Sequence, residues 1–418
     1  MKVISVVEGA TQRLGVHEIR VPGAVNISQS LADLGHQVVV CMGGPVVPDH
    51  EKFVQPTLSD VLGRTHDAFG IVPYCASQYW SFSTDLIADL NRYATSIDFI
   101  LLHSLYSFPV LAGYLIARRY RKPYGVWLHG VLAPIQRTIS RRRKWVYDRL
   151  ISRCILEQAS MVVYTARGEY EETNALNLTT RAALIPLGMD IKAYEVLPRR
   201  GQFRAQFLSG HDGPIVLYLG RLNVKKGLDL LIRAMKQVMA QRPEARLVIV
   251  GGGDPPSFTS TVREWIRACD LEAQTVLTGP ITDLEQKKQV FIDADVFVLP
   301  SHAENFGFAM FEAMTSRVPV VVSDTLNYAT EVSRFEAGLV VHRDAQEIAT
   351  GIMRLLDDSD LRQHMGENGL RLARTYSWDA TAQKLERAID SIVRGQPLPA
   401  DLVLSEPANA RSPMAVLQ

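Results

Sequence analysis

The sequence of 418 residues is too long for one ordinary domain, and its length predicts two domains of about 200 residues each. A hydrophobic fraction of 47% and a charged fraction of 21% are typical of a globular protein that folds in water. The formal net charge of +1 gives no support to nucleic-acid binding, so we expect no nucleic-acid partner.

The cysteines and the apolar runs indicate the compartment. The four cysteines form no C-x-x-C pair, which favours a reducing compartment and argues against a thiolate zinc site: they are Cys41, Cys75, Cys154 and Cys269. The first apolar run, 3–7, is too short for a secretion signal. No run approaches the ~18 apolar residues of a membrane span. We therefore expect a cytoplasmic protein.

The N-terminal half alternates apolar strands with helical stretches. We predict helices at 24–34, 84–96 and 107–120, and strands at 3–7, 38–41, 99–102, 124–128 and 161–165. This alternation predicts an open, mostly parallel sheet with helices on both faces and right-handed crossovers.

The alternation restarts at 215, after a basic segment of weak pattern, 197–212, which we expect to be a surface excursion. We predict strands at 215–220, 246–251, 275–278, 296–299 and 318–323, and helices at 227–241, 258–269 and 284–292. These Val- and Leu-rich strands separated by helices predict a second parallel sheet.

The predicted fold class is therefore α/β, with two Rossmann-like, doubly wound parallel-sheet domains facing a central cleft. We place the first domain at 1–190, the second at 191–376, a last amphipathic helix at 377–394, and a disordered tail rich in Pro, Ala and Ser at 395–418. In such sheets ligands bind at the carboxyl ends of the strands, so the loops that follow the strands are the candidate sites.

The loop and helix after the strand at 296–299 carry two carboxylates. Glu304 lies in the loop, and Glu312 follows about two turns along the predicted helix 306–314. Their directions differ by roughly 80°, so both can border one cleft. Gly307 between them allows close backbone approach to a ligand. Taken alone, an E-x7-E pattern favours a structural interpretation, in which Glu304 is a helix-cap neighbour and Glu312 a solvated helix carboxylate.

The motif Gly220-Arg221-Leu222-Asn223-Val224-Lys225-Lys226-Gly227 follows the first strand of the second half and opens a helix. A diphosphate leaving group becomes more negative as the bond to it breaks. Cations and helix N–H groups at this position would stabilise that transition state more than the ground state. The alternative is a solvated basic loop.

Together, the E-x7-E segment with its internal Phe-Gly and the G-R-x-x-x-x-K-G motif resemble the donor site of retaining glycosyltransferases of family 4, which have the GT-B fold. The resemblance implies that Glu304 contacts the transferred sugar, Glu312 binds the ribose hydroxyls, and Arg221 and Lys226 hold the diphosphate. It also places the backbone of Asn305, Phe306, Gly307 and Phe308 against the sugar, and Gly279 and Ile281 against the nucleobase. Such enzymes generally need no bound metal or other cofactor, and the sequence shows no metal-ligand cluster.

Two further candidates come from the first half. His129 ends the strand at 124–128 and resembles the histidine of the family's acceptor domain near the donor sugar. It could act as an acid, a base or a hydrogen-bond partner, or be a structural histidine. In the first loop the family's Gly-Gly pair is absent, and we prefer Gly15 over Gly23 as the backbone approach to the diphosphate.

The segment 137–153 is basic and has an apolar seam. Its charges are Arg141, Arg142, Arg143, Lys144, Arg149 and Arg153, next to Trp145, Val146, Leu150 and Ile151. This pattern predicts peripheral contact with an anionic membrane that carries a lipid-linked acceptor, or alternatively a solvated face over an ordinary core seam.

The resemblance implies transfer of a sugar from a UDP- or GDP-sugar to a hydroxyl of a glycan or lipid-linked acceptor, with retention of configuration. The pathway it favours is polysaccharide or lipopolysaccharide assembly. Two alternatives remain open: a nucleotide-sugar epimerase or hydrolase of similar shape, and a non-catalytic protein that binds a membrane or a partner.

Overall fold

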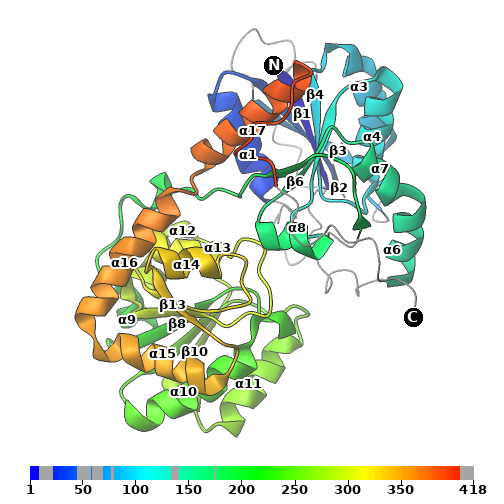
Figure 1. Cartoon of the computed structure of the whole chain (residues 1–418). Helices are drawn as coiled ribbons and strands as arrows, with labels where there is room; N and C mark the ends of the chain where they lie inside the picture. The colour runs from blue at the N-terminus through cyan, green and yellow to red at the C-terminus, as the bar shows by residue number, and fades with distance from the viewer. Residues whose placement is uncertain are drawn as a thin grey trace, which may run out of the picture. The chain divides into compact units, whose positions relative to one another are not determined.

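The computed structural model describes residues 1–8, 22–44, 58, 69–76, 80–132, 141–173 and 176–404. The chain forms two compact units, the first of Met1–Gly188 with Trp378–Gln418 and the second of Met189–Ser377. Each unit is built on one parallel β-sheet with helices packed on it (Figure 1). The predicted fold class of two Rossmann-like α/β domains is confirmed. The division falls beside the predicted boundaries at 190 and 376.

The sheet of the first unit has seven strands in the order β3-β2-β1-β4-β5-β6-β7. The strands are β1 (Lys2–Glu8), β2 (Gln37–Gly44), β3 (Phe69–Cys75), β4 (Phe99–His103), β5 (Tyr124–Trp127), β6 (Met161–Tyr164) and β7 (Ala182–Leu184). Because β1 pairs with both β2 and β4, the order reverses beside β1. This reversal is where ligands bind in open α/β sheets.

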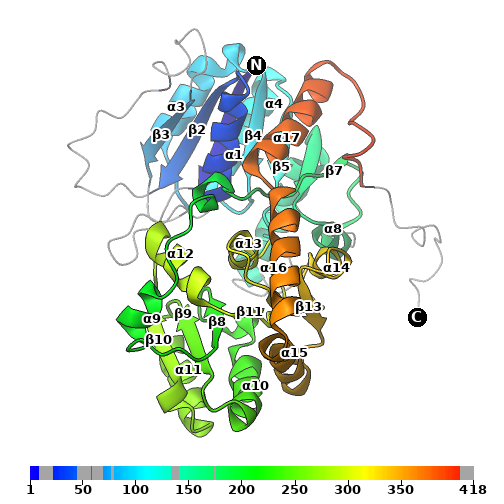
Figure 2. The same ribbon diagram turned by 90° about the vertical axis from the view of Figure 1, so that its left-hand side faces the viewer.

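Helices cover both faces of this sheet. Val7 and Val40 pack with Ala24 of α1 (Pro22–Asp33), whereas the neighbouring Val6 and Val39 belong to the core on the other face. That second face is covered by α3 (Thr84–Tyr93) and α4 (Phe108–Tyr120). The described residues of this unit also form α6 (Arg141–Tyr147), α7 (Arg153–Glu157) and α8 (Arg167–Thr173). The last helix, α17 (Trp378–Val393), lies alongside α1 in both views (Figures 1 and 2), so the chain returns to the first unit after the second.

The segment after α17 covers the edge of the first sheet. Leu402 accepts a backbone hydrogen bond from Leu184 at 2.8 Å, and Leu404 donates one to Ala182 at 3.2 Å. The side chains of Leu398, Leu402 and Leu404 are buried. The prediction of a disordered tail from 395 is therefore wrong for 395–404, because these leucines and the backbone pair with the open edge of β7. Residues 405–418 lie outside the described residues.

The second unit has six strands in the order β10-β9-β8-β11-β12-β13. They are β8 (Ile215–Leu219), β9 (Arg246–Val250), β10 (Thr275–Gly279), β11 (Val296–Leu299), β12 (Val320–Ser323) and β13 (Gly338–Val341). The helices are α9 (Gln202–Phe207), α10 (Leu228–Gln241), α11 (Phe258–Ala268), α12 (Leu284–Asp293), α13 (Phe308–Thr315), α14 (Ala329–Arg334), α15 (Ala345–Asp357) and α16 (Ser359–Arg374).

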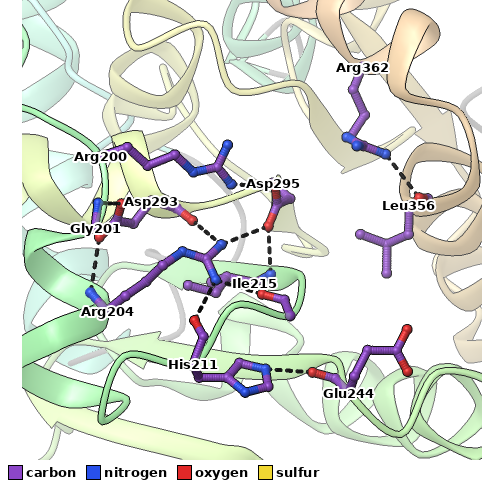
Figure 3. Close-up of polar contacts among 11 residues, drawn as sticks. Arg200, Gly201, Arg204, His211, Ile215, Glu244, Asp293, Asp295, Leu356 and Arg362 are labelled. Carbon is purple, nitrogen blue, oxygen red and sulfur yellow. Dashed lines mark hydrogen bonds and ion pairs between the residues drawn. The ribbon is translucent and has the colours of Figure 1, made fainter.

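The segment 197–212 is not a plain surface excursion, because α9 lies within it and Arg204 is buried. The Arg204 guanidinium donates to the backbone carbonyls of His211, Gly213 and Asp293 and contacts the Asp295 carboxylate at 3.1 Å (Figure 3). Asp295 also accepts from the backbone N–H of Ile215, the first residue of β8, at 2.8 Å. The buried arginine therefore fastens this segment to the amino-terminal edge of the second sheet.

Replacing Arg204 by Met should lower the free energy of unfolding of the second unit by roughly 3–5 kcal/mol, because a mostly buried Asp295 carboxylate would lose its internal cation. Arg200 contacts the same carboxylate at 2.6 Å, but its side chain is 55% exposed. Arg200→Met is therefore the matched control and should change the free energy by less than about 1 kcal/mol. Urea denaturation followed by tryptophan fluorescence measures both, and equal effects would contradict this assignment.

Candidate functional site

The candidate donor site lies at the carboxyl edge of the second sheet, where glycine turns follow three adjacent strands. The N–H of Gly220 donates to the carbonyl of Val250 at 3.0 Å, and the N–H of Gly251 donates to that of Gly279 at 2.9 Å. A Cβ atom at Gly251 would lie 1.9 Å from the Gly220 carbonyl oxygen, so only glycine fits there. Beside Gly279 the space is open, since a Cβ there would meet no atom within 4 Å. Close-packed backbone turns and, beside Gly279, free space thus lie at one edge of the sheet.

A second close backbone contact joins the turn after β8 to the loop after β11. Gly227 has φ +64°, and a Cβ there would lie 2.2 Å from the carbonyl oxygen of Pro300. The N–H of His302 donates to the carbonyl of Lys225 at 2.7 Å. Two segments that are far apart in the sequence are thereby held together, which places Lys226 next to Glu304.

Lys226 and Glu304 form an ion pair between Nζ and Oε1. Their side chains are only 17% and 14% exposed. The hydroxyl of Ser301 donates to the same carboxylate oxygen at 2.9 Å. Oε1 of Glu304 thus accepts from both Lys226 and Ser301, and no partner of Oε2 lies among the described residues.

Arg221 lies on the same turn and is 67% exposed. Its guanidinium pairs with Asp254 at 2.8 Å, and its carbonyl accepts from the Tyr218 hydroxyl at 2.9 Å. Burial and the nearby charge of Glu304 raise the pKa of Tyr218 well above its usual value, so this hydroxyl stays protonated and donates. The turn is fixed by its backbone, while the Arg221 side chain remains accessible to an anion.

Glu312 forms a separate cluster on α13. Its Oε1 pairs with Nζ of Lys287 from α12 and accepts from the Tyr194 hydroxyl at 3.0 Å. Burial, together with the charge of Glu312, raises the pKa of Tyr194, which therefore acts as a donor. The structure thus gives each of the two predicted carboxylates its own lysine. Neither Lys287 nor Tyr194 was among the candidates from the sequence.

The aromatic residues of the loop have different surroundings. Phe306 is buried and its ring stacks on that of Phe311, with centroids 4.4 Å apart, so only its backbone is available to a ligand. Phe308 is 39% exposed, and Gly307 caps α13 with φ +82°. The side-chain oxygen of Asn305 is buried and has no partner among the described residues. Ile281 is partly buried beyond the end of β10.

The carboxyl edge of the first sheet holds His129, with φ +53°. Its ring is nearly parallel to that of Trp127, with centroids 5.2 Å apart, and its Nε2 lies 2.9 Å from Nδ1 of His103 at the end of β4. Burial lowers the pKa of His103 to about 3 and the pKa of His129 well below its usual value. His103 directly follows the predicted strand 99–102, a signal that could have identified it. Gly15 lies outside the described residues.

Glu169 holds the loop that carries His129. Its carboxylate accepts from the backbone N–H of Thr165 at 2.7 Å and from that of Gly130. The side chain is buried, and burial raises its pKa from 4.5 to about 7, although the two N–H donors oppose this shift. Glu169 therefore tethers the His129 loop to α8.

The raised pKa of Glu169 predicts a pH-dependent stability. Between pH 4.5 and 7 the folded chain binds a proton that the unfolded chain has lost, so the free energy of unfolding should fall as pH rises through this window. The fall should be about 3 kcal/mol, at about 1.4 kcal/mol per pKa unit, and Glu169→Gln should abolish it. The exposed Glu171 on the same helix provides the control Glu171→Gln, which should keep the wild-type slope. Denaturation at pH 5, 6, 7 and 8 measures the free energy of unfolding as a function of pH. If this free energy changes with pH in Glu169→Gln as it does in the wild type, the assignment is wrong.

Comparison with known proteins places the chain in a family. Its residues 199–372 match the family described as Glycosyl transferases group 1, and residues 23–193 match Glycosyltransferase Family 4. It is 28% identical over 305 residues to a D-inositol 3-phosphate glycosyltransferase of Corynebacterium aurimucosum, covering 69% of this chain and 71% of the relative. A protein of the same name from Kineococcus radiotolerans is 29% identical over 218 residues, and this chain spans about half of its length (49% of this chain and 50% of the relative).

The fold of this chain matches that of a solved structure. The structure of Anabaena HepE in complex with UDP-glucose superimposes with a TM-score of 0.70 at 18% identity, covering 94% of this chain and 100% of that chain. The likeness shows the two-domain fold, and the family matches cover both domains. The chain therefore belongs to the glycosyltransferases of the group 1, family 4 type, with the GT-B fold.

Proposed function

We propose that this chain transfers a sugar from a UDP- or GDP-sugar to a hydroxyl acceptor with retention of configuration. The observation that carries the proposal is the Lys226–Glu304 ion pair at the carboxyl edge of the second sheet. A lysine beside a carboxylate can neutralise a diphosphate while the carboxylate contacts the attached sugar. Arg221, accessible on the same turn, adds a second cation for the diphosphate.

The proposed chemistry depends on charge that develops on the leaving diphosphate. As the bond to the anomeric carbon breaks, the diphosphate oxygen becomes more negative, and the Lys226 ammonium stabilises it more than it stabilises the bound donor. Glu304 is ion-paired, which makes it a weak nucleophile and favours a role in accepting hydrogen bonds from the sugar hydroxyls through Oε2. Retention is inferred from the family resemblance. The same resemblance implies that His129 contacts the donor sugar.

The nucleoside would bind along the rest of the edge. Glu312 would accept the ribose hydroxyls, with Lys287 and Tyr194 holding its carboxylate in place. The open space beside Gly279 would admit the nucleobase next to Ile281. The UDP-glucose complex of Anabaena HepE supports a uridine nucleotide as the first choice to test.

The acceptor we propose is a hydroxyl of a glycan or lipid-linked molecule in polysaccharide or lipopolysaccharide assembly. The similar proteins named D-inositol 3-phosphate glycosyltransferase support a polyhydroxy acceptor in general terms. Transfer without a resident metal or cofactor remains part of the proposal. Among the residues that the structure describes, no group of three or more His, Cys, Asp or Glu side chains could hold a metal ion.

Thermal stabilisation by UDP, GDP and ADP, each with and without Mg²⁺, tests the donor site. A nucleotide at ~100 times its dissociation constant should add about 2.7 kcal/mol to the free energy of unfolding. Glu312→Ala should reduce the shift, because the ribose loses its acceptor, whereas Glu336→Ala on the exposed surface should keep it. If no nucleotide stabilises the wild type, the proposed donor site is wrong.

We propose that the segment 137–153 makes peripheral contact with the anionic cytoplasmic face of a membrane. Trp145 and Leu150 are 63% and 65% exposed, and they border a groove of about 530 Å³ that Arg149 and Arg153 also line. Exposed apolar side chains beside cations suit the interface of an anionic bilayer. None of the helices within the described ranges is long and apolar enough to cross a bilayer. Residues 133–140 and the side chains of 141–143 lie outside the described residues.

Sedimentation with vesicles tests this contact. The wild type should bind vesicles that contain phosphatidylglycerol and not vesicles of phosphatidylcholine alone. The double variant Trp145→Ser/Leu150→Ser should bind at least about tenfold more weakly, because each apolar side chain buried in the interface contributes about 1.5–3 kcal/mol. Leu115, 52% exposed on α4, supplies the control Leu115→Ser, which should bind like the wild type. Equal binding by all variants would exclude this surface.

A further inference from the structure

His103 and His129 share one hydrogen bond at the carboxyl edge of the first sheet. His103 ends β4 and pairs in register with Trp127, which ends the neighbouring β5. The three rings of His103, Trp127 and His129 lie within 19° of parallel. The N···N distance of 2.9 Å between His103 Nδ1 and His129 Nε2 requires that one nitrogen donates and the other accepts.

The backbone next to both histidines adopts the strained left-handed conformation. Ser104 and Tyr106, which follow His103, have φ +72° and +50°, and His129 itself has φ +53°. Left-handed backbone at non-glycine residues persists only where surrounding contacts hold it, and it clusters at functional sites. For the His129 loop, one such contact is the carboxylate of Glu169, which accepts from Gly130 and Thr165. The His129 loop is therefore held in place by the Glu169 carboxylate.

The second nitrogen of His103 decides which way the hydrogen bond runs. Nε2 of His103 is buried and has no partner among the described residues. If His129 donated to Nδ1, the proton of a neutral His103 would lie on Nε2 as a buried donor without an acceptor. If His103 donates from Nδ1 to His129, Nε2 of His103 carries no proton and is an unpaired acceptor instead. Unpaired buried N–H donors are rarer than unpaired acceptors, so the second arrangement is favoured.

We propose that His103 is a positioning residue that donates from Nδ1 to Nε2 of His129 and so fixes the proton of His129 on Nδ1. This inference rests on the proposed function, in which His129 contacts the donor sugar. Its Nε2 is occupied by His103, so Nδ1 is the nitrogen left for the ligand. His129 therefore offers an N–H donor to a sugar oxygen and cannot act as a general base through that nitrogen.

Nitrogen NMR of the ¹⁵N-histidine-labelled wild-type chain at pH 7 tests the tautomer directly. The signals of His129 are assigned as those missing from His129→Gln. The expected result is a protonated Nδ1 and a bare Nε2 on His129, with both histidines neutral. A protonated Nε2 on His129, or an averaged mixture of tautomers, would overturn the inference.

Two substitutions at His103 separate positioning from packing. In His103→Asn the amide nitrogen takes the place of Nδ1 and can still donate, so the His129 tautomer and kcat should be kept within about threefold. His103→Leu removes the donor, and kcat should fall roughly tenfold while the Kd of the nucleoside diphosphate is unchanged. Equal losses in both variants, or no loss in either, would contradict the assignment.

The two proposals fail in distinguishable ways. If the wild type turns over no nucleotide sugar, the proposed function fails, but the tautomer measured in the free protein still decides the role of His103. If the wild type is active and His129 carries its proton on Nε2, the positioning role of His103 is wrong, while the proposed function stands.

Discussion

The ion pair between Lys226 and Glu304 depends on a backbone contact that only glycine permits. Gly227 has a left-handed φ of +64°, and a Cβ there would lie 2.2 Å from the Pro300 carbonyl. From the other side, the Ser301 carbonyl accepts from the hydroxyl of Ser323 at 2.6 Å, which fastens the loop to the end of β12. Because both charged side chains are mostly buried, each needs the other, and a mutual contact avoids the penalty of an isolated buried charge. The fold thus places the Glu304 carboxylate next to the proposed diphosphate site, while the Lys226 ammonium offsets its repulsion of an anion.

Much of the architecture follows from local patterns. The buried strands of the second sheet, such as Ile215–Leu219 and Arg246–Val250, are apolar runs, and their predicted positions are correct to within a residue or two. The patterns do not assign β3, which contains Gly70 and Pro73, residues that weaken a strand prediction. The structure tolerates them because β3 is an edge strand. The segment with α9 has a weak pattern because its buried Arg204 depends on Asp293 and Asp295, about 90 positions away in the sequence.

The candidate site shows the same division between local and long-range signals. Its motifs identify Lys226, Glu304 and Glu312, because a glycine turn and two carboxylates at helical spacing are visible in a short window. They do not identify Lys287 or His103, whose roles arise from contacts between elements far apart in the chain. His103 nevertheless carries a usable signal, since it ends an apolar strand of a parallel sheet. Lys287 carries no such signal, because lysines are common on amphipathic helices such as α12.

Binding of a nucleoside diphosphate to Lys226→Met and Glu304→Gln tests the central claim most directly. Calorimetry with the diphosphate that stabilises the wild type measures each Kd, and release of diphosphate from its sugar donor measures turnover. We predict that Lys226→Met weakens binding of the diphosphate at least about tenfold. Glu304→Gln should bind it at least as tightly as the wild type, because the Lys226 ammonium is freed and a negative charge is removed. Glu304→Gln should nevertheless lose turnover. If Glu304→Gln weakens binding as much as Lys226→Met, the ion pair does not prepare the site for the diphosphate, and the account is wrong.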